Sequence, residues 1–422
     1  MRGFLIAAPS SGSGKTTITL ALLRALRQRG INVRSAKSGP DYIDPKFHQA
    51  ASGQPCVNVD AWAMSPAQIR GRVPEADILV VEGAMGLFDG APPDNRGSAA
   101  DLAAHLALPV ILIVDAARMA GSVAPLVTGF AQFSDRITVA GVILNNVGSP
   151  RHDTMLRRAL APTGIPVVGT MYRNADLALP SRHLGLVQAQ EHDGLNKFLD
   201  NAAKIAAQSI DIDHLISIAT APETGPARCI PPPAQRIAVA SDLAFAFAYP
   251  HLLTDWQAQG AEVIPFSPLA DDPVPDADLI YLPGGYPELH AGRLAANDGF
   301  LNSLRMAAQT TDIYGECGGY MTLGQRLIDA DGTAHTMAGL LPLETSFAAR
   351  KLHLGYRRVT ATKGPFTGTW AAHEFHYATT LSATGTPLFT ATDAEGTQLP
   401  DMGLCEGRVS GSFAHLICPQ GL

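Results

Sequence analysis

Short apolar runs alternate with helical patterns through the first 220 residues. The stretch "TTITLALLRALRQRG" at residues 16–30 is one such helical pattern. The apolar runs are rich in Val, Ile and Leu without polar alternation, as is typical of strands buried on both faces of a parallel sheet. Repeated strand–helix–strand units predict a doubly wound α/β domain over residues 1–220. The predicted strands are "GFLIAA" (3–8), "NVRSAK" (32–37), "DILVVEG" (77–83), "PVILIVDA" (109–116), "TVAGVILNNV" (138–147) and "PVVGTM" (166–171).

A stretch rich in proline and glycine follows, "APETGPARCIPPPAQ" at residues 221–235, and its composition predicts a linker. The apolar pattern then restarts, which predicts a second α/β domain over residues 236–422. Its predicted strands lie in "RIAVASD" (236–242), "AEVIPFSP" (261–268), "ADLIYLPGG" (277–285) and "TDIYGECGG" (311–319).

Length and composition agree with two globular domains. The chain has 422 residues, 46% of them apolar and 16% charged, which is too long for one ordinary core and too apolar for a disordered chain. A net charge of −7 argues against a general nucleic-acid binder. The five cysteines are scattered without a C-x-x-C pair, so neither a disulfide framework nor a zinc site is indicated. No signal peptide and no apolar run of ~20 residues is present, which predicts a cytoplasmic protein.

A glycine-rich loop between a predicted strand and a predicted helix suggests a phosphate site. In Gly14-Lys15-Thr16, the backbone and the lysine can meet phosphate oxygens, and the threonine hydroxyl can meet Mg²⁺. The strict P-loop pattern fails at Pro9, and a plain glycine loop is the alternative. The flanking strand and helix favour the P-loop. The predicted ATP-binding residues are Ser11, Gly12, Ser13, Gly14, Lys15, Thr16 and Thr17.

Glu82 ends the predicted strand "DILVVEG". A carboxylate at the carboxyl end of a parallel strand beside a P-loop is placed for a second Mg²⁺ contact. A solvated loop acid is the alternative, but Gly83 and Gly86 favour an open loop that faces a ligand.

These motifs resemble the dethiobiotin synthetase type of P-loop ligase, whose phosphate loop departs from the strict motif at the same position. The resemblance implies that a carboxylate is activated as an acyl phosphate and then attacked by a nitrogen nucleophile. It further implies that Asp60, in "NVDA", binds Mg²⁺ and that Lys37 meets the substrate carboxylate.

The stretch "YGECGGYM" at residues 314–321 places Cys317 between a predicted strand and small residues. Such a sequence suits a strained strand-to-helix turn that exposes a nucleophile, and a helix N-terminus would lower the thiol pKa. In "PGGYPE", Gly284 and Gly285 are candidates for an oxyanion hole, and His415 in "GSFAHLI" is a candidate base. The alternative is inert packing, which is the interpretation for Cys56, Cys229, Cys405 and Cys418.

The glycines, the nucleophile and the late histidine follow one another along the chain in an order that resembles the class I glutamine amidotransferase domain. The resemblance implies that glutamine is hydrolysed to supply ammonia. The usual glutamate two residues after the histidine is replaced here by Ile417. We therefore predict a Cys317–His415 dyad and leave the third group open.

Nearly the whole chain is similar to the cobyrinic acid a,c-diamide synthase family, including its hydrogenobyrinic acid branch. The similarity rests on "KSGPDYIDPKFH" (37–48), "VEGAMGLFDG" (81–90) and "HEFHY" (373–377). It implies that Mg²⁺, ATP and glutamine are used to amidate two peripheral carboxylates of a corrin ring in cobalamin biosynthesis. A simple turn would explain "GPDYIDP" equally well. The residues to which the family pattern gives roles in handling substrate or Mg-ATP are Asp41, Tyr42, Asp44, Glu82 and Asp89.

The segment "HEFHY" suits a strand, on which His373, Phe375 and Tyr377 would share one face. Glu374 and His376 would share the other face, where one or the other could line the substrate cleft or the glutaminase interface; the sequence does not choose between them. His373 and His376 would point in opposite directions, which argues against a zinc site.

Three rival functions are weighed against this prediction. Cobyric acid synthase has the same two-domain plan but usually lacks "GPDY". A Ni-sirohydrochlorin a,c-diamide synthase is harder to exclude from the sequence. A partitioning-type P-loop ATPase, a switch protein and not a synthetase, has no use for Cys317. The sequence leaves open whether the substrate carries cobalt, the order of the a and c amidations, and whether the chain forms a homodimer.

Overall fold

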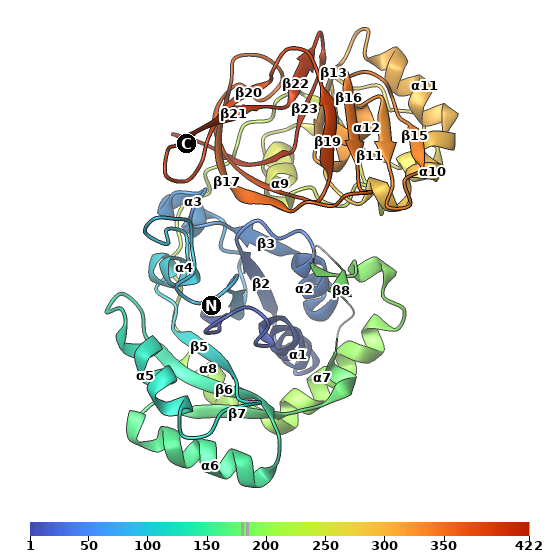
Figure 1. Ribbon diagram of the computed structural model, residues 1–422. Helices are drawn as coiled ribbons and strands as arrows, with labels where there is room; N and C mark the ends of the chain where they lie inside the picture. Colours follow the sequence, from blue (N-terminus) through green and yellow to red (C-terminus); the bar gives the residue numbers. More distant parts are fainter. Residues whose placement is uncertain (179–180, 183–184, 422) are drawn as a thin grey trace. The chain divides into compact units, whose positions relative to one another are not determined.

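The computed structural model describes residues 1–178, 181–182 and 185–421. Two compact units make up the chain, Met1–Arg228 and Cys229–Leu422 (Figure 1). The division between them falls inside the predicted linker at residues 221–235. Each unit is described by itself.

The first unit is built on a seven-stranded sheet in which all neighbouring strands are parallel, in the order β3-β2-β4-β1-β5-β6-β7. The side chains of its central strands β1, β4 and β5 are almost completely buried, as their apolar runs predict. The doubly wound α/β prediction is confirmed, and six of the seven strands lie at predicted runs. The short edge strand β3 was not predicted. The strands are β1 (Arg2–Ala7), β2 (Val33–Ser38), β3 (Cys56–Val59), β4 (Ile78–Glu82), β5 (Val110–Asp115), β6 (Val139–Val147) and β7 (Val167–Tyr172).

Helices connect these strands. α1 packs against α2 and α7, α3 packs against α4, and α5 packs against α6. A small hairpin, β8 (Ser181–Arg182) with β9 (Gly185–Leu186), precedes α7. The helices are α1 (Lys15–Gln28), α2 (Asp44–Ser52), α3 (Pro66–Gly71), α4 (Ala99–Leu106), α5 (Val123–Gln132), α6 (Pro150–Leu160), α7 (Leu195–Ser209) and α8 (Ile212–Ile218), with 3₁₀ turns η1 (Ala161–Thr163), η2 (Ala175–Leu177) and η3 (Ala189–Glu191).

The second unit has a six-stranded sheet in the order β11-β10-β12-β13-β23-β22. Its strands are parallel except for the last pair, which is antiparallel. The four strands predicted in this unit all belong to this sheet. The strands are β10 (Arg236–Ala240), β11 (Glu262–Phe266), β12 (Leu279–Leu282), β13 (Asp312–Glu316), β22 (Leu404–Glu406) and β23 (Val409–Ser412).

The second unit also carries two further sheets that were not predicted, in the orders β15-β14-β16-β19 and β21-β20-β17-β18-β24. Nearly all their strand pairs are antiparallel, so this unit is richer in antiparallel strands than expected. The strands are β14 (Arg326–Ile328), β15 (Ala334–Thr336), β16 (Leu343–Ser346), β17 (His353–Ala361), β18 (Gly368–His376), β19 (Thr379–Ala383), β20 (Phe389–Thr392), β21 (Gln398–Met402) and β24 (Ala414–Pro419).

The main core of the second unit surrounds the short helix α12, and Tyr320, Met321 and Leu323 of that helix lie within it. The helices are α9 (Pro250–Ala258), α10 (Ala291–Ala296), α11 (Asp298–Ala307) and α12 (Gly318–Leu323), with 3₁₀ turns η4 (Pro268–Ala270) and η5 (Pro287–Leu289).

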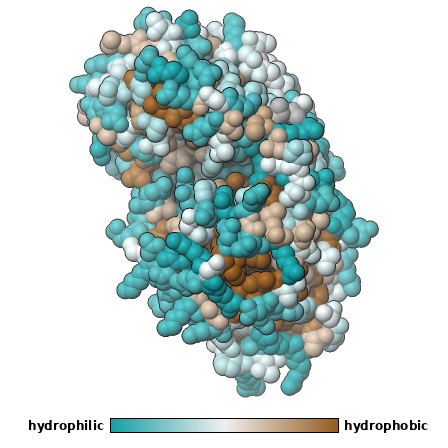
Figure 2. All heavy atoms as spheres, turned by 180° about the vertical axis from the view of Figure 1, so that it is seen from behind, coloured by the Kyte–Doolittle hydropathy of each residue, from teal (hydrophilic) through white to brown (hydrophobic). Residues whose placement is uncertain are grey.

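The surface is mostly hydrophilic on the face seen from behind, with separate hydrophobic areas (Figure 2). Exposed large apolar side chains include Phe133 and Met306. Among the described residues, every helix is too short or too polar to cross a bilayer.

Candidate active sites

The predicted P-loop lies between β1 and α1, and its glycines have the backbone that the loop requires. Gly12 has φ 79° and Gly14 has φ 91°, values that L side chains rarely adopt. A side chain at Gly14 would also collide with Asn145, whose amide donates a hydrogen bond of 2.9 Å to the Ser13 carbonyl. Asn145, at the end of β6, therefore holds the loop from a distant strand, and no local pattern predicted it.

The Lys15 ammonium lies inside this loop. It donates hydrogen bonds to the carbonyls of Met85, at 2.6 Å, and Ser10, at 3.4 Å. Met85 has φ 51°, a strained value for a residue other than glycine, and such strain is common at ligand sites. Burial lowers the pKa of Lys15. The lysine is thus already turned into the loop that would receive phosphates.

A buried group of polar side chains lies next to Lys15, at the carboxyl ends of β2 and β4. Lys37 and Glu82 are register neighbours there, and the Lys37 ammonium lies 2.7 Å from Glu82 Oε1 and 2.6 Å from Asp44 Oδ2. The Thr16 hydroxyl is 2.7 Å from Glu82 and 3.2 Å from Asp44. The structure therefore brings Thr16 and Glu82, predicted as Mg²⁺ ligands, together with Lys37 and Asp44, which were predicted to handle substrate.

In this group, opposite charges offset the effect of burial on the pKa values of Glu82 and Lys37. Burial alone would raise the pKa of Glu82, but Lys37 and His48 lower it well below its usual value. Burial alone would lower the pKa of Lys37, but Asp44 and Glu82 raise it well above its usual value. Desolvation raises the pKa of Asp44 to about 6. The Glu82 carboxylate and the Lys37 ammonium therefore remain charged although both are buried.

His48 completes this group and was missed by the sequence interpretation. Its Nε2 lies 2.7 Å from Glu82 Oε2, and its Nδ1 lies 3.5 Å from the Cys56 sulfur. Both His48 and Glu82 are fully buried. Burial would lower the pKa of His48, but Cys56 and Glu82 raise it to about 10. One signal could have found it, because Asp44 and His48 are four residues apart on α2 and so share a helix face.

Three other residues with predicted roles shape the surrounding loops. Asp41 Oδ1 accepts hydrogen bonds from the backbone N–H groups of Ile43 and Asp44, at the start of α2, and Asp41 Oδ2 lies 3.7 Å from the Lys37 ammonium. Tyr42 is half-buried in the same loop. Asp89 Oδ2 accepts from the Gly86 N–H at 2.8 Å. Both aspartates therefore stabilise the loops that carry them. The substrate roles of Asp41, Tyr42 and Asp89 stay predictions.

Asp60, the other predicted Mg²⁺ ligand, follows the edge strand β3. Its Oδ1 accepts from the N–H groups of Trp62 and Ala63, and no hydrogen bond of the described residues joins it to Thr16 or Glu82. Its Oδ2 is buried with no hydrogen-bond partner among those residues, and burial raises the Asp60 pKa. The oxygen donors of Thr16, Glu82 and Asp44 fit a hard cation such as Mg²⁺. The role of Asp60 as a Mg²⁺ ligand stays a prediction.

In the second unit, Cys317 lies on the predicted strained turn, between β13 and α12. Its backbone has φ 46° and ψ −99°, outside the regions that residues other than glycine favour. The Cys317 N–H donates to the Ser412 carbonyl at 2.8 Å. A β-carbon at Gly319 would collide with the Leu282 carbonyl, so the glycine allows the helix to approach β12 closely.

The predicted partners of Cys317 come together around it. Gly284, Cys317 and His415 follow the ends of β12, β13 and β23, three adjacent parallel strands. A β-carbon built on Gly284 would lie 2.5 Å from His415 Cε1 and 3.4 Å from Cys317 Cβ. The Gly285 nitrogen lies 3.0 Å from a β-carbon built on Gly318. The structure thus places nucleophile, base and oxyanion candidates around one point.

The protonation states differ from the sequence prediction. Cys317 is only 4% exposed, and burial, followed by the Glu288 carboxylate, raises its pKa well above the usual value. The expectation of a lowered thiol pKa is therefore wrong for this state, because desolvation outweighs the dipole of a six-residue helix. Burial also lowers the pKa of His415 to about 3. The resting pair is a neutral thiol beside a neutral imidazole, which is the form that can accept a proton.

Ile417, at the position where the family usually has the orienting glutamate, lies at an irregularity of strand β24. In the pairing of β18 with β24, Ala371 faces Cys418 and Ala372 faces Leu416, which makes Ile417 the extra residue of a β-bulge. Strict alternation of faces fails at a bulge. The face on which the Ile417 side chain lies therefore does not follow from its spacing to His415.

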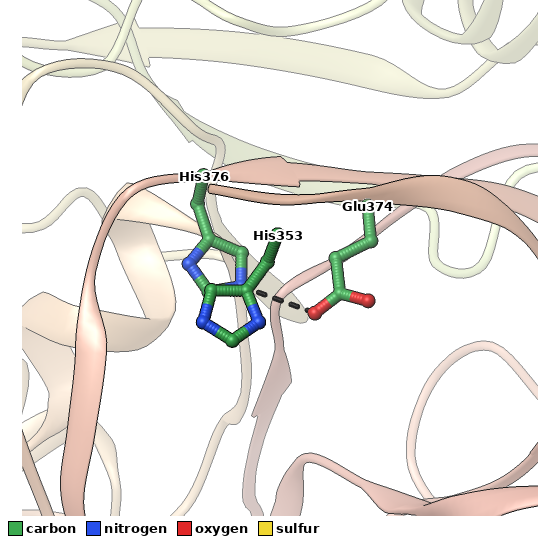
Figure 3. A group of neighbouring side chains, drawn as sticks. All are labelled: His353, Glu374 and His376. Atoms are coloured by element: carbon green, nitrogen blue, oxygen red, sulfur yellow. Dashed lines mark hydrogen bonds and ion pairs between the residues drawn. The ribbon is translucent and has the colours of Figure 1, made fainter. Parts of the chain in front are cut away.

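The segment "HEFHY" lies on β18 and at its end, with Glu374 and His376 on one face as predicted. His353, the register partner of His376 on β17, completes a cluster of three possible metal ligands. Figure 3 shows the His353 ring over the His376 ring with Glu374 beside them, and the rings stack at 4.6 Å and 5°. Nitrogen lone pairs lie in the ring plane, so two parallel stacked rings do not direct them at one ion.

Glu374 has other partners. Its Oε2 is 2.8 Å from an Arg357 nitrogen and its Oε1 is 3.1 Å from His376 Nε2. Burial would raise the pKa of Glu374, but His376 and Arg357 lower it to about 2. The cluster is therefore an ion-pair network, and the geometry disfavours a zinc site.

Two domain families match the chain. Residues 4–187 match the CobQ/CobB/MinD/ParA nucleotide binding domain, and residues 236–421 match the CobB/CobQ-like glutamine amidotransferase domain. The first match spans the phosphate loop and the second spans Cys317 and His415.

Full-length relatives are also similar. A hydrogenobyrinate a,c-diamide synthase of Brucella abortus is 55% identical over 430 residues, which cover 99% of this chain and 98% of that protein. The enzyme of the same name from Rhizobium meliloti is 54% identical, with 99% of each chain covered. That of Rhodobacter capsulatus is 50% identical, with 99% of this chain and 98% of that protein covered.

Proposed function

Because this chain belongs to the family of the hydrogenobyrinate a,c-diamide synthases, we propose that it amidates the a and c side-chain carboxylates of hydrogenobyrinic acid. ATP drives the reaction and glutamine supplies the nitrogen, as a step of cobalamin biosynthesis. The observation that carries the proposal is 55% identity over 99% of the chain. The two groups of side chains, one around Lys15 and one around Cys317, supply the two half-reactions that such a ligase needs.

The first unit performs the activation in this proposal. A substrate carboxylate oxygen attacks the γ-phosphorus of ATP, ADP leaves, and an acyl phosphate forms. The P-loop N–H groups and Lys15 bind the phosphates, and Lys15 exchanges its contact with the Met85 carbonyl for phosphate oxygens. Thr16, Glu82 and Asp44 would hold Mg²⁺, which when bound neutralises phosphate charge. Ammonia then attacks the acyl carbon, phosphate leaves, and a carboxamide remains after loss of a proton.

The second unit supplies the ammonia. His415 takes the proton of the Cys317 thiol, and the thiolate attacks the side-chain amide carbon of glutamine. Backbone N–H groups near Gly285 bind the oxyanion that forms. The carbon–nitrogen bond breaks as His415 returns the proton to the leaving ammonia. Water then hydrolyses the thioester, which releases glutamate and restores the thiol.

The substrate is tested by incubating the protein with hydrogenobyrinic acid, ATP, Mg²⁺ and glutamine and measuring the mass of the product. We expect two successive conversions of carboxylate to carboxamide. Parallel reactions with cobyrinic acid and with nickel-loaded sirohydrochlorin define the specificity. Amidation of only one of these, with hydrogenobyrinic acid unchanged, would replace the proposed substrate but keep the chemistry. Absence of glutamine hydrolysis under all conditions would favour a switch ATPase instead.

A further inference from the structure

Glu316, the residue directly before Cys317, lies behind His415 in the second unit. It is the last residue of β13 and is only 1% exposed. Its Oε2 lies 3.7 Å from His415 Nδ1. β13 and β24, which carry these two residues, are far apart in the sequence, so no local pattern could link them.

Two hydrogen bonds hold the Glu316 carboxylate in place. Oε1 accepts from the Leu416 N–H at 2.9 Å, and Oε2 accepts from the Tyr281 hydroxyl at 2.7 Å. Leu416 is the residue next to His415, so the first bond ties the carboxylate to the backbone of the strand that carries the base. A buried carboxylate anchored at both oxygens is a fixed reference point for the imidazole.

We propose that Glu316 is the positioning residue that orients His415 during glutamine hydrolysis, in place of the glutamate that Ile417 has replaced. This inference rests on the proposed function of the second unit. Glu316 faces Nδ1, which leaves Nε2 of the imidazole to take the Cys317 proton. The 3.7 Å separation is about 0.8 Å longer than an N–H···O hydrogen bond. Catalytic hydrogen bonds are often long before substrate binds.

The physical need for such a carboxylate is clear from the burial of the site. When His415 takes the thiol proton, an imidazolium forms at a position that is only 2% exposed. A buried cation without a partner is costly, and a carboxylate beside Nδ1 stabilises it while holding the ring in the productive orientation.

Glu374 is the rival for this role, because it also lies in the electrostatic surroundings of His415. Its two oxygens are already engaged by Arg357 and His376. Reorienting Glu374 toward His415 would break a buried ion pair. Glu316 needs only a small movement and keeps its existing bonds.

The test compares variants by the rate of glutamine hydrolysis. Glu316→Gln keeps the size of the side chain but removes its charge, and we expect kcat to fall on the order of 100-fold. KM for glutamine should change less than about threefold, since Glu316 does not bind substrate in this proposal. Thermal unfolding of each variant serves as the measure of folding, because amidation driven by added ammonium reports only on the first unit.

Cys405→Ser is the control, because Cys405 is a buried residue of the same unit that has no part in the proposed site. We expect its kcat to stay within about threefold of the unaltered protein. A full rate in Glu316→Gln would overturn the inference, and so would an equal loss in Cys405→Ser, which would assign the effect to packing. If Glu316→Gln does not fold, Glu316→Asp replaces it. Its side chain is shorter by one methylene, so the carboxylate would lie farther from His415, and a full glutaminase rate in that variant counts against the inference.

Cys317→Ser separates this inference from the proposed function. If Cys317→Ser hydrolyses glutamine normally, the proposed nucleophile is wrong and the role of Glu316 falls with it. If Cys317→Ser is inactive and Glu316→Gln is fully active, only the role of Glu316 is wrong.

Discussion

At the scale of single residues, the chemistry of the second unit depends on how each side chain is buried. Cys317 is held on a strained backbone at φ 46° and kept as a neutral thiol by desolvation. Its reactivity must therefore come from proton transfer to His415 when substrate is bound. A group with a perturbed pKa beside a strained nucleophile is the arrangement expected of a catalytic site.

Cys317→Ser should abolish glutamine-dependent amidation, because a serine hydroxyl beside the same base is a far weaker nucleophile toward an amide in a site shaped for a thiol. Amidation driven by ammonium should stay within about twofold of normal, since the first unit is unaltered. Both rates are measured by product mass. Cys405→Ser, another buried thiol of this unit, is the control and should affect neither. Loss of both rates in Cys317→Ser would contradict the two-site mechanism.

The rate of glutamine hydrolysis should rise with pH. Burial raises the pKa of Glu316 to about 8, so at pH 7 this group is largely protonated. Only the ionised form can stabilise an imidazolium, and its population grows as the pH rises through the Glu316 pKa. The groups facing Glu316 are Tyr281 on β12, His415 and the Leu416 N–H on β24, and Tyr314 on its own strand.

The measurement is ammonia release from glutamine between about pH 6 and pH 9. The rising limb should be present in the unaltered protein and absent in Glu316→Gln. Burial also raises the pKa of the Cys317 thiol, so the thiolate population likewise increases as the pH rises. An identical limb in both proteins would therefore assign the pH dependence to the thiol and not to Glu316.

At the scale of elements, helix α2 supports the predicted metal ligand on β4. Asp44 at its first turn and His48 one turn later both reach the buried polar group, with His48 holding Glu82 Oε2. The helix thus fixes from one side a carboxylate that Lys37 fixes from the other. Mutating a residue that hydrogen-bonds a metal ligand typically weakens metal affinity by about 10–100-fold.

His48→Asn should weaken the use of Mg-ATP, because the shorter side chain leaves Glu82 without one of its buried partners. We expect the Mg²⁺ concentration for half-maximal amidation to rise about tenfold. The unfolding free energy should fall by about 1–3 kcal/mol. Mg²⁺ titration of ammonium-driven amidation and thermal unfolding measure the two effects. His105→Asn on α4 is the matched control, and an equal Mg²⁺ shift in that variant would refute a specific role for His48.

At the scale of the whole molecule, each unit carries its own candidate site. Both sites lie at the carboxyl ends of parallel strands, where loops from neighbouring strands converge. The two half-reactions should therefore be separable by mutation, one unit at a time.

Lys15→Ala should abolish amidation with either glutamine or ammonium as the nitrogen source. The reason is that the ammonium group that meets the β- and γ-phosphates is lost, whereas the Cys317 site lies in the other unit. Product mass gives amidation, and glutamate release shows that the second unit remains folded and active. Retained amidation with ammonium would remove the P-loop from the mechanism.

Much of the fold was predictable because its signals are local. Short runs, most of them apolar, identified ten strands of the two main sheets, since strands buried on both faces need no polar alternation. Of the antiparallel strands in the two further sheets, only the end of β18 was predicted, from "HEFHY". Strands such as β17 and β19 are largely half-buried or exposed and so lack an unbroken apolar run, and β3 has only four residues. Glycines at φ 79° and 91° were recognised in the P-loop because only that residue type tolerates such a backbone.

The sequence by itself therefore determined the two α/β units, the phosphate loop and the turn that carries Cys317, all properties of short segments. Only the tertiary structure decided which distant side chains meet. The order of β2 and β4 joins Lys37 to Glu82, packing of α2 adds His48, and the approach of β24 to β13 sets Glu316 beside His415. Burial is also a property of the whole fold, which is why the direction of the Cys317 pKa shift could not be read from its neighbours in the chain.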